Sequence, residues 1–237
     1  RQAMMRVATW NMRRRRANWD VLPISGLDIV LLQEACPPPP SLAGHIEFQK
    51  LEPRRGSSTW GTAIWSRWPL RGLSGSTCHP GAAVVAEIQA PGGPVTAYSL
   101  YALFEHIEFS TKSKDYAVTT LHRLLSDLTG HLEEPARQAR NVLGGDFNCN
   151  PKWDLKSKHP TNRLLIDRVE AYGLTSVLPI DAHRQIPTHR KSQIDYLFIG
   201  TAFSVDAANV DTDGPTQGLS DHHPVVAQLT LARDGPC

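Results

Sequence analysis

The sequence holds 237 residues, with 25 lysines and arginines against 23 acids and a formal net charge of +2. This mild positive charge permits a polyanionic partner without requiring one. No run approaches the roughly 20 apolar residues of a membrane span, and the four cysteines include no CxxC pair, which argues against a zinc or disulfide framework. No secretory apolar segment opens the sequence, so we expect a cytoplasmic location, although a leader already removed would leave no trace. We also expect a monomer.

Short apolar runs rich in β-branched and aromatic residues recur along the chain and predict strands. In the first half these runs are residues 5–10, 28–33, 61–66, 82–89 and 95–100. Further strands are expected at residues 141–143, 194–199, 207–210 and 224–231. The runs before Asn11, Glu34 and Asp146 lack strict alternation of polar and apolar residues, as expected for strands that are covered on both faces.

Two segments have a helical pattern. Residues 113–131 carry a single apolar stripe at helical spacing, and residues 161–172 stop before Gly173, a residue typical of a helix C-terminus. The predicted strands outnumber the helices and occur in both halves of the chain, and no linker-like change of composition divides it. We therefore expect one layered α/β domain over residues 1–237, with two packed sheets.

Polar residues stand at the ends of several apolar runs, where α/β proteins commonly bind metal ions and phosphate. A lone acid at a strand end is more often a helix cap or a turn former. Six such segments in one chain are hard to explain by capping, and they predict a metal-assisted hydrolase of phosphate esters. The segments are Thr9-Trp10-Asn11, Leu32-Gln33-Glu34, Ala97-Tyr98, Gly145-Asp146-Phe147-Asn148, Gln193-Ile194-Asp195-Tyr196 and Ser220-Asp221-His222.

Three of these residues are candidate metal ligands. Hard cations such as Mg²⁺ prefer carboxylate oxygens. Glu34 fits as a direct ligand because its carboxylate emerges from a buried strand, Asp221 is a second candidate, and Asn11 is a neutral oxygen donor nearby.

The remaining candidates could activate water and bind phosphate. Asp146 is suited to orient or deprotonate a water molecule, and Asn148 to hold a phosphate oxygen. His222 fits as a general base or hydrogen-bond donor, with Asp195 fixing its tautomer. His222 and His223 are adjacent and point to different faces of an extended chain, so we expect only one of them, His222, to be catalytic.

Together these segments resemble the endonuclease/exonuclease/phosphatase superfamily, which has the deoxyribonuclease-I-like fold. The similarity extends from Val7 to about Leu229, and its most specific parts are residues 145–148 and 220–222. It implies a four-layer α/β/β/α sandwich with two packed central mixed sheets and a site at one edge of them. It also implies hydrolysis of a phosphoester by an activated water with Mg²⁺ or Mn²⁺.

The resemblance also implies roles for individual residues. Glu34 corresponds to the main metal ligand, Asn11 to its neighbour and Asp221 to a second acid beside the metal. Asp146 and Asn148 correspond to the pair that orients water and binds phosphate, and Asp195 and His222 to a coupled dyad. Tyr98 occupies the strand end where relatives place a Tyr or His near the scissile phosphate, with Tyr101 and His106 as alternatives.

The sequence also departs from known branches of the superfamily. Abasic-site endonucleases carry an acid two residues after the Asn, whereas this chain has Arg13, and the Pro-Asn pattern expected after Tyr98 is missing. The strand-end His of the deoxyribonuclease and sphingomyelinase branches is missing too. The substrate class therefore depends on the loops.

The loops favour nucleic acid. Residues 13–16 are four consecutive arginines directly after Asn11, which would place cationic side chains at the rim of the site. Aromatic residues near the expected site could stack on a base; they are Trp19, Trp60, Trp153 and Tyr101. We therefore expect a nuclease-type phosphodiesterase. The alternatives are a phosphomonoesterase, a lipid or small-molecule phosphodiesterase with the same metal centre, or a non-catalytic binding module of the same fold.

Overall fold

The structure is a computed structural model that describes residues 3–52, 59–73, 75, 77–103, 116–156 and 159–232. Within these residues, twelve strands form two six-stranded sheets. The first sheet has the order β11-β12-β1-β2-β4-β3, with bounds β1 Ala3–Asn11, β2 Ile29–Ala35, β3 His45–Lys50, β4 Gly61–Ser66, β11 Phe203–Val210 and β12 Val225–Leu231. The second has the order β5-β6-β7-β8-β10-β9, with bounds β5 Leu70–Gly72, β6 Ala83–Ala90, β7 Gly93–Tyr101, β8 Asn141–Asp146, β9 Thr175–Ser176 and β10 Asp195–Ile199.

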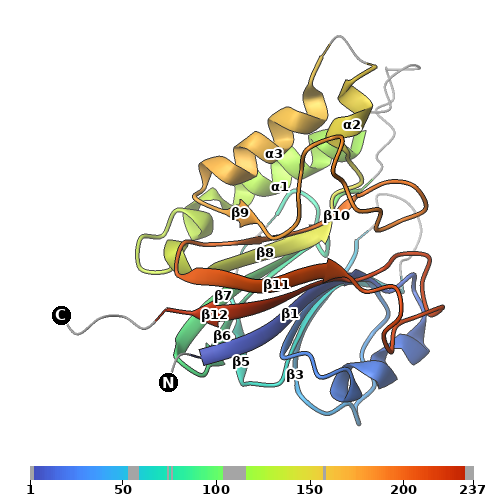
Figure 1. Cartoon of the computed structure of the whole chain (residues 1–237). Helices are drawn as coiled ribbons and strands as arrows, with labels where there is room; N and C mark the ends of the chain where they lie inside the picture. Colours follow the sequence, from blue (N-terminus) through green and yellow to red (C-terminus); the bar gives the residue numbers. More distant parts are fainter. Residues whose placement is uncertain are drawn as a thin grey trace.

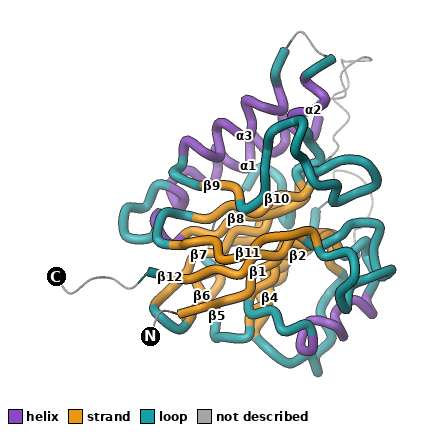
Figure 2. Tube along the Cα trace, in the orientation of Figure 1, coloured by secondary structure: helices purple, strands orange, loops and turns teal. Residues whose placement is uncertain are grey.

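The two sheets pack face to face and are covered on their outer faces (Figure 1). The helices α1 (Tyr116–Leu132) and α3 (Thr161–Ala171) lie over the second sheet, together with the short α2 (Pro151–Asp154). A 3₁₀ segment, η1 (Arg16–Ile24), covers the first sheet, and η2 (Gln138–Arg140) precedes β8. Figure 2 shows the strands as two central layers between helical layers. The predicted four-layer α/β/β/α sandwich is confirmed.

In the part of the chain that the structure describes, three apolar cores fill the spaces between the four layers. The middle core joins the sheets through residues such as Val7, Leu31 and Val142. An outer core between the second sheet and the helices includes Leu121 and Leu143. Strands β1, β2, β7, β8 and β10 contribute to the middle core and to one outer core, which explains why their sequences are apolar with little alternation.

Each sheet is mixed, because β1 pairs in parallel with β2 and β7 in parallel with β8, whereas their other neighbours are antiparallel. The carboxyl ends of each parallel pair therefore meet at one edge of its sheet, on the right-hand side of Figure 1. Within the described residues, no helix is long and apolar enough to span a membrane.

The predicted strands and helices all have counterparts; β4 has the predicted bounds, residues 61–66, and the other bounds are shifted. The first residues of the helix expected at 113–131 lie outside the described residues. The predictions missed η1, η2, α2, β3, β5 and β9. Strand β3 lies at the edge of its sheet and is half-exposed, so its sequence, His45 to Lys50, is mostly polar and gives little apolar signal.

The Gly144-Gly145 pair allows close backbone packing inside β8. A Cβ at Gly145 would overlap the carbonyl oxygen of Leu100 on β7. A Cβ at Gly144 would lie 3.0 Å from the Leu31 side chain and 3.1 Å from that of Thr9, both in the opposite sheet. The two glycines therefore allow β8 to approach its neighbouring strand and the facing sheet.

We predict that Gly145→Ala lowers the free energy of unfolding by about 3 kcal/mol, because the overlap with Leu100 is with backbone that cannot move aside. Gly130→Ala is the matched control. Gly130 lies near the end of α1 with open space around its Cα, and alanine there is expected to stabilise the helix by up to about 1 kcal/mol. Urea unfolding measures both, and a Gly145→Ala protein as stable as the wild type would contradict the packing argument.

Candidate functional site

Strand alternation places three polar side chains in one row on the inner face of the second sheet. In β7 and β10, Ala97 and Leu197 lie in the middle core, and alternation puts Tyr101 and Asp195 on the same face. Asp146 ends β8 on that face, and the register pairs it with Tyr101 on one side and with Asp195 on the other. The row therefore lies at the mouth of the space between the sheets.

The first sheet contributes Asn11 and Glu34 to the same place. Asn11 ends β1 on the inner face, but Glu34 by alternation would point with Leu32 toward η1. Glu34 has a left-handed backbone (φ 47°), and the pairing of β2 with β4 is irregular between Leu32 and Ala35. This bulge redirects the Glu34 carboxylate, as bulges beside functional sites commonly do.

Asn11 connects the carboxylates of the two sheets. Its Nδ2 donates to Asp146 Oδ2 at 3.0 Å and to Glu34 Oε1 at 3.4 Å. Its Oδ1 accepts from the backbone N–H of Arg13 at 2.9 Å. In this arrangement Asn11 offers its amide nitrogen to the acids, rather than the oxygen that we expected to bind a metal.

Glu34 is held by a tyrosine and an arginine. The Tyr101 hydroxyl donates to Oε1 at 3.0 Å, and Arg14 Nε donates to Oε2 at 2.8 Å. The Arg14 guanidinium lies 4.3 Å from the centre of the Trp60 ring, which in turn packs edge-on against Tyr101. Arg13 and Arg14 both have positive φ, a backbone conformation that non-glycine residues adopt mostly where the surroundings enforce it.

His222 and Asp195 form a hydrogen-bonded pair. His222 Nδ1 lies 3.0 and 3.1 Å from the two carboxylate oxygens of Asp195. Thr188 Oγ1 donates to Asp195 at 2.6 Å and accepts from two backbone N–H groups, which orients the carboxylate. Ser220 Oγ donates to the backbone oxygen of Asn11 and accepts from the N–H of His222, so the Ser-Asp-His segment is tied to the end of β1.

The close packing of these groups shifts their pKa values. Burial, together with the Asp195 carboxylate, raises the pKa of Asp146 well above its ordinary value. Burial opposes a charge on His222, but the carboxylate of Asp195, aided by Asp146 and Asp221, outweighs it and raises the pKa of His222 to about 9. At neutral pH His222 is therefore mostly a cation.

Asn148 and Asp221 lie beside this cluster. Asn148 has a left-handed backbone (φ 46°); its N–H donates to Asp146 Oδ1 at 3.0 Å and its Nδ2 to the carbonyl of Ala102. Because an amide nitrogen has two hydrogens, a second donor remains in the group. Asp221 is more exposed and pairs with Arg13 at 3.5 Å and with His189 at 3.7 Å.

Tyr98 does not lie at this site, which corrects the prediction from the sequence. Its side chain is in the outer core under the helices, and its hydroxyl donates to the carbonyl oxygen of His131 at 3.0 Å. Tyr101, three residues later, lies on the opposite face of β7 and occupies the position at the site that was expected for Tyr98. The other alternative, His106, lies outside the described residues.

Of the two adjacent histidines, His222 is the one paired with Asp195; His223 donates its backbone N–H to the carbonyl of Thr188. Among the tryptophans considered for stacking, Trp19 is fully buried and Trp153 is 47 % exposed. Sequence reasoning missed Thr188 and His189, and it expected Arg14 only as a cation at the rim, not as a partner of Glu34. None of the three ends a predicted strand, so the pattern that identified the other residues could not point to them.

A family model described as the Endonuclease/Exonuclease/phosphatase family matches residues 8–222. The chain belongs to this family. Enzymes of the family hydrolyse phosphoesters and depend on a divalent metal ion. A search of the curated proteins finds no match.

Solved structures share the fold at low sequence identity. The endonuclease domain of TRAS1, a telomere-specific non-LTR retrotransposon, is 20% identical with a TM-score of 0.63, over 98% of this chain and 100% of that one. A 3′-5′ exonuclease (NExo) from Neisseria meningitidis is 20% identical with a TM-score of 0.64, over 94% and 98%. An AP endonuclease from Archaeoglobus fulgidus is 19% identical with a TM-score of 0.66, over 94% and 98%.

We predict that Tyr101→Phe slows metal-supported hydrolysis of bis(p-nitrophenyl) phosphate by about tenfold, because Glu34 loses a hydrogen bond worth more than 1 kcal/mol. Tyr98→Phe is the matched control and is expected to keep the wild-type rate while losing about 1 kcal/mol of unfolding free energy. Initial rates and urea unfolding measure these effects. If Tyr98→Phe alone lost activity, the tyrosine that supports hydrolysis would be Tyr98 and not Tyr101.

Proposed function

We propose that the protein is a divalent-metal-dependent phosphodiesterase that cleaves nucleic acid with an activated water. One observation carries the proposal: the carboxylate of Asp146 lies between the Asn11 amide and the Asp195–His222 pair. The ligand atoms of Asp146, Asp195 and His222 lie within 4.8 Å of one another. Asp146, the candidate base, and His222, the candidate cation, thus face the same small volume between the sheets.

The residues around Glu34 fit a hard divalent cation. Glu34 Oε1 and Asp146 Oδ2 both contact Asn11 Nδ2, so carboxylates of the two sheets converge at one point. Carboxylate oxygens are the ligands that Mg²⁺ and Mn²⁺ prefer. Glu34 is therefore the carboxylate that would hold the metal, which would polarise the phosphoryl oxygens and stabilise the leaving oxygen.

The protein side chains supply the rest of the chemistry. Asp146, whose pKa is raised, is suited to take a proton from the attacking water. His222, mostly protonated at neutral pH, is suited to donate a hydrogen bond to a phosphate oxygen as negative charge develops there. Asp195 and Thr188 position His222, and Asn148 offers an amide donor next to Asp146.

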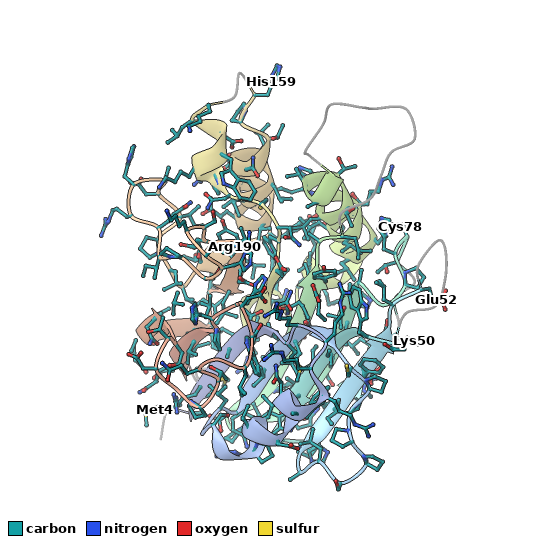
Figure 3. All side chains as sticks on the ribbon, turned by 90° about the vertical axis from the view of Figure 1, so that its right-hand side faces the viewer. Met4, Lys50, Glu52, Cys78, His159 and Arg190 are labelled. Atoms are coloured by element: carbon teal, nitrogen blue, oxygen red, sulfur yellow. The ribbon has the colours of Figure 1, made fainter. Side chains whose placement is uncertain are left out.

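Exposed cations around the site favour nucleic acid over a small phosphoester. The side chains of Arg13 and Arg14 are 51% and 53% exposed at the edge where β1 ends. Arg190 and Lys191 are exposed on the loop that carries Thr188, and Figure 3 shows Arg190 on the face that looks out from this edge. Such a distribution suits the repeated phosphates of a strand. The TRAS1 domain, the exonuclease and the AP endonuclease described above point to the same class of substrate.

The proposal is tested by one panel of single- and double-stranded DNA, RNA, phosphorylated small molecules and phospholipid, each with Mg²⁺ or Mn²⁺ and with EDTA. We expect cleavage of nucleic acid that EDTA abolishes. Metal-independent turnover, or turnover of small phosphomonoesters or lipid alone, would contradict the proposal, as would no turnover of any phosphoester.

In the same panel, Glu34→Gln is expected to abolish turnover and to weaken Mn²⁺ binding, measured by calorimetry, by about tenfold or more. The matched control is Glu87→Gln. Glu87 is another half-buried carboxylate paired with an arginine, Arg71, but it lies on β6 beside the beginning of β7, away from this edge. Unchanged Mn²⁺ binding by Glu34→Gln would remove Glu34 from the metal site.

We further predict that His222→Ala lowers the turnover rate by about 100-fold or more, the usual loss for a donor to an oxygen on which negative charge develops. His223→Ala is the neighbouring control and should keep a rate close to that of the wild type, because its contact with Thr188 is made by the backbone. Single-turnover rates on the substrate found in the panel measure both. If His223→Ala lost the activity and His222→Ala kept it, His223 would be the catalytic histidine.

A further inference from the structure

A second group of potential metal ligands lies on the outer side of His222. His189, Asp221 and His222 each offer one ligand atom, and these atoms lie within 4.8 Å of one another. The two imidazole rings stack with their centres 4.4 Å apart and their planes 18° from parallel. His189 Nε2 is 3.7 Å from Asp221 Oδ2. The ligand atoms of the three side chains therefore lie close together.

Backbone contacts hold these side chains in place. His189 forms bridges with Ser192 and with His222, and the backbone N–H of His223 donates to the carbonyl of Thr188. Arg190 has a left-handed backbone (φ 51°) in the turn that leads to Ser192. The ring of His189 therefore starts from a backbone position fixed against the Ser-Asp-His segment.

The donor set differs from the oxygen-rich site at Glu34. Two imidazole nitrogens and one carboxylate oxygen, with a fourth position left open, are typical ligands of Zn²⁺, whereas Mg²⁺ prefers oxygen alone. A histidine that binds a metal through one ring nitrogen usually donates the N–H of the other to a carboxylate, and His222 Nδ1 is paired with Asp195 in this way. His222 Nε2 is then the nitrogen available to a metal ion.

Both exposure and charge permit an ion to enter. The side chains of His189 and Asp221 are 22% and 38% exposed, so the group is reached from solvent. Arg13 Nε is nearest to Asp221 Oδ1, at 3.5 Å, while Oδ2 faces His189. A metal ion can therefore use the second oxygen without displacing the arginine. It must displace a proton from His222, since imidazole ligands bind metal in the neutral form.

We propose that His189, Asp221 and His222 form a zinc site, separate from the Glu34 site, whose occupation inhibits the enzyme. The inhibitory part rests on the function proposed above, because Zn²⁺ on His222 would remove the hydrogen-bond donor that faces the phosphate. The binding part rests only on the three side chains.

The test measures Zn²⁺ binding by calorimetry with excess Mg²⁺ present to occupy the oxygen site. We expect His189→Asn and Asp221→Asn each to weaken one Zn²⁺ site by about tenfold or more. His183→Asn, at an exposed histidine of the same loop, is the matched control and should bind Zn²⁺ like the wild type. All the proteins keep the same cysteines, so the differences report the imidazole and carboxylate ligands. Wild-type Zn²⁺ affinity in both His189→Asn and Asp221→Asn would overturn the site.

Inhibition is measured separately, by titrating Zn²⁺ into Mg²⁺-supported hydrolysis and comparing each variant with its own zinc-free rate. The wild type should be inhibited over the range in which calorimetry detects binding, and His189→Asn should need about tenfold more Zn²⁺ or more. Binding through His189 without inhibition would overturn the inhibitory part. If no phosphoester is hydrolysed at all, the proposed function fails, while calorimetry still decides whether the zinc site exists.

Discussion

The site depends on the Asn11 side chain, which joins the two sheets at the edge where their parallel strands end. One amide nitrogen contacts Asp146 in the second sheet and Glu34 in the first. The backbone oxygen of Asn11 accepts a hydrogen bond from the Ser220 hydroxyl, and this hydroxyl accepts one from the backbone N–H of His222. A single residue thus fixes the separation of the sheets at this edge and the position of the Ser-Asp-His segment, and the other groups are placed relative to it.

Strand register and alternation explain most of the arrangement, and most of what the sequence could predict. Residues at strand ends were recognisable because each follows an apolar run. Asp146 and Asp195 lie side by side because β8 and β10 are neighbouring strands and their register pairs these two residues. Alternation also separates Tyr101 from Tyr98: the two differ by three positions and so face opposite sides of β7. Ala97 faces the middle core, and every second residue after it shares that face, so alternation selects Tyr101 rather than Tyr98 for the site.

Other parts of the site could not be predicted from local pattern. Glu34 reaches the site only through a left-handed residue in a bulge, against the alternation of β2. His189 meets His222 across 33 positions of sequence, through a loop whose path no periodic pattern describes. The arginines after Asn11 were expected to be rim cations, yet Arg14 is also a structural partner of Glu34, and its place depends on two consecutive positive φ angles. These features come from tertiary packing, which overrides local preference at functional sites.

The distribution of charge partners separates the four acids by chemistry. Glu34 pairs with Arg14, Asp221 with Arg13, and Asp195 with His222, so each of these carboxylates has a close cationic partner. Asp146 is held instead by neutral donors, the amide of Asn11 and the backbone N–H of Asn148, while Asp195 stands beside it on the next strand.

Burial and this like charge give Asp146 a raised proton affinity, which a fully paired carboxylate would lack. A base needs a pKa near the working pH, and a donor to phosphate needs to keep its proton. Asp195 is paired directly with His222, whereas Asp146 receives its hydrogen bonds from amides and lies in the same group of ligand atoms, within 4.8 Å. In the proposed function, the division of labour between a water-activating acid and a phosphate-binding histidine would therefore follow from which strand neighbour receives which partner.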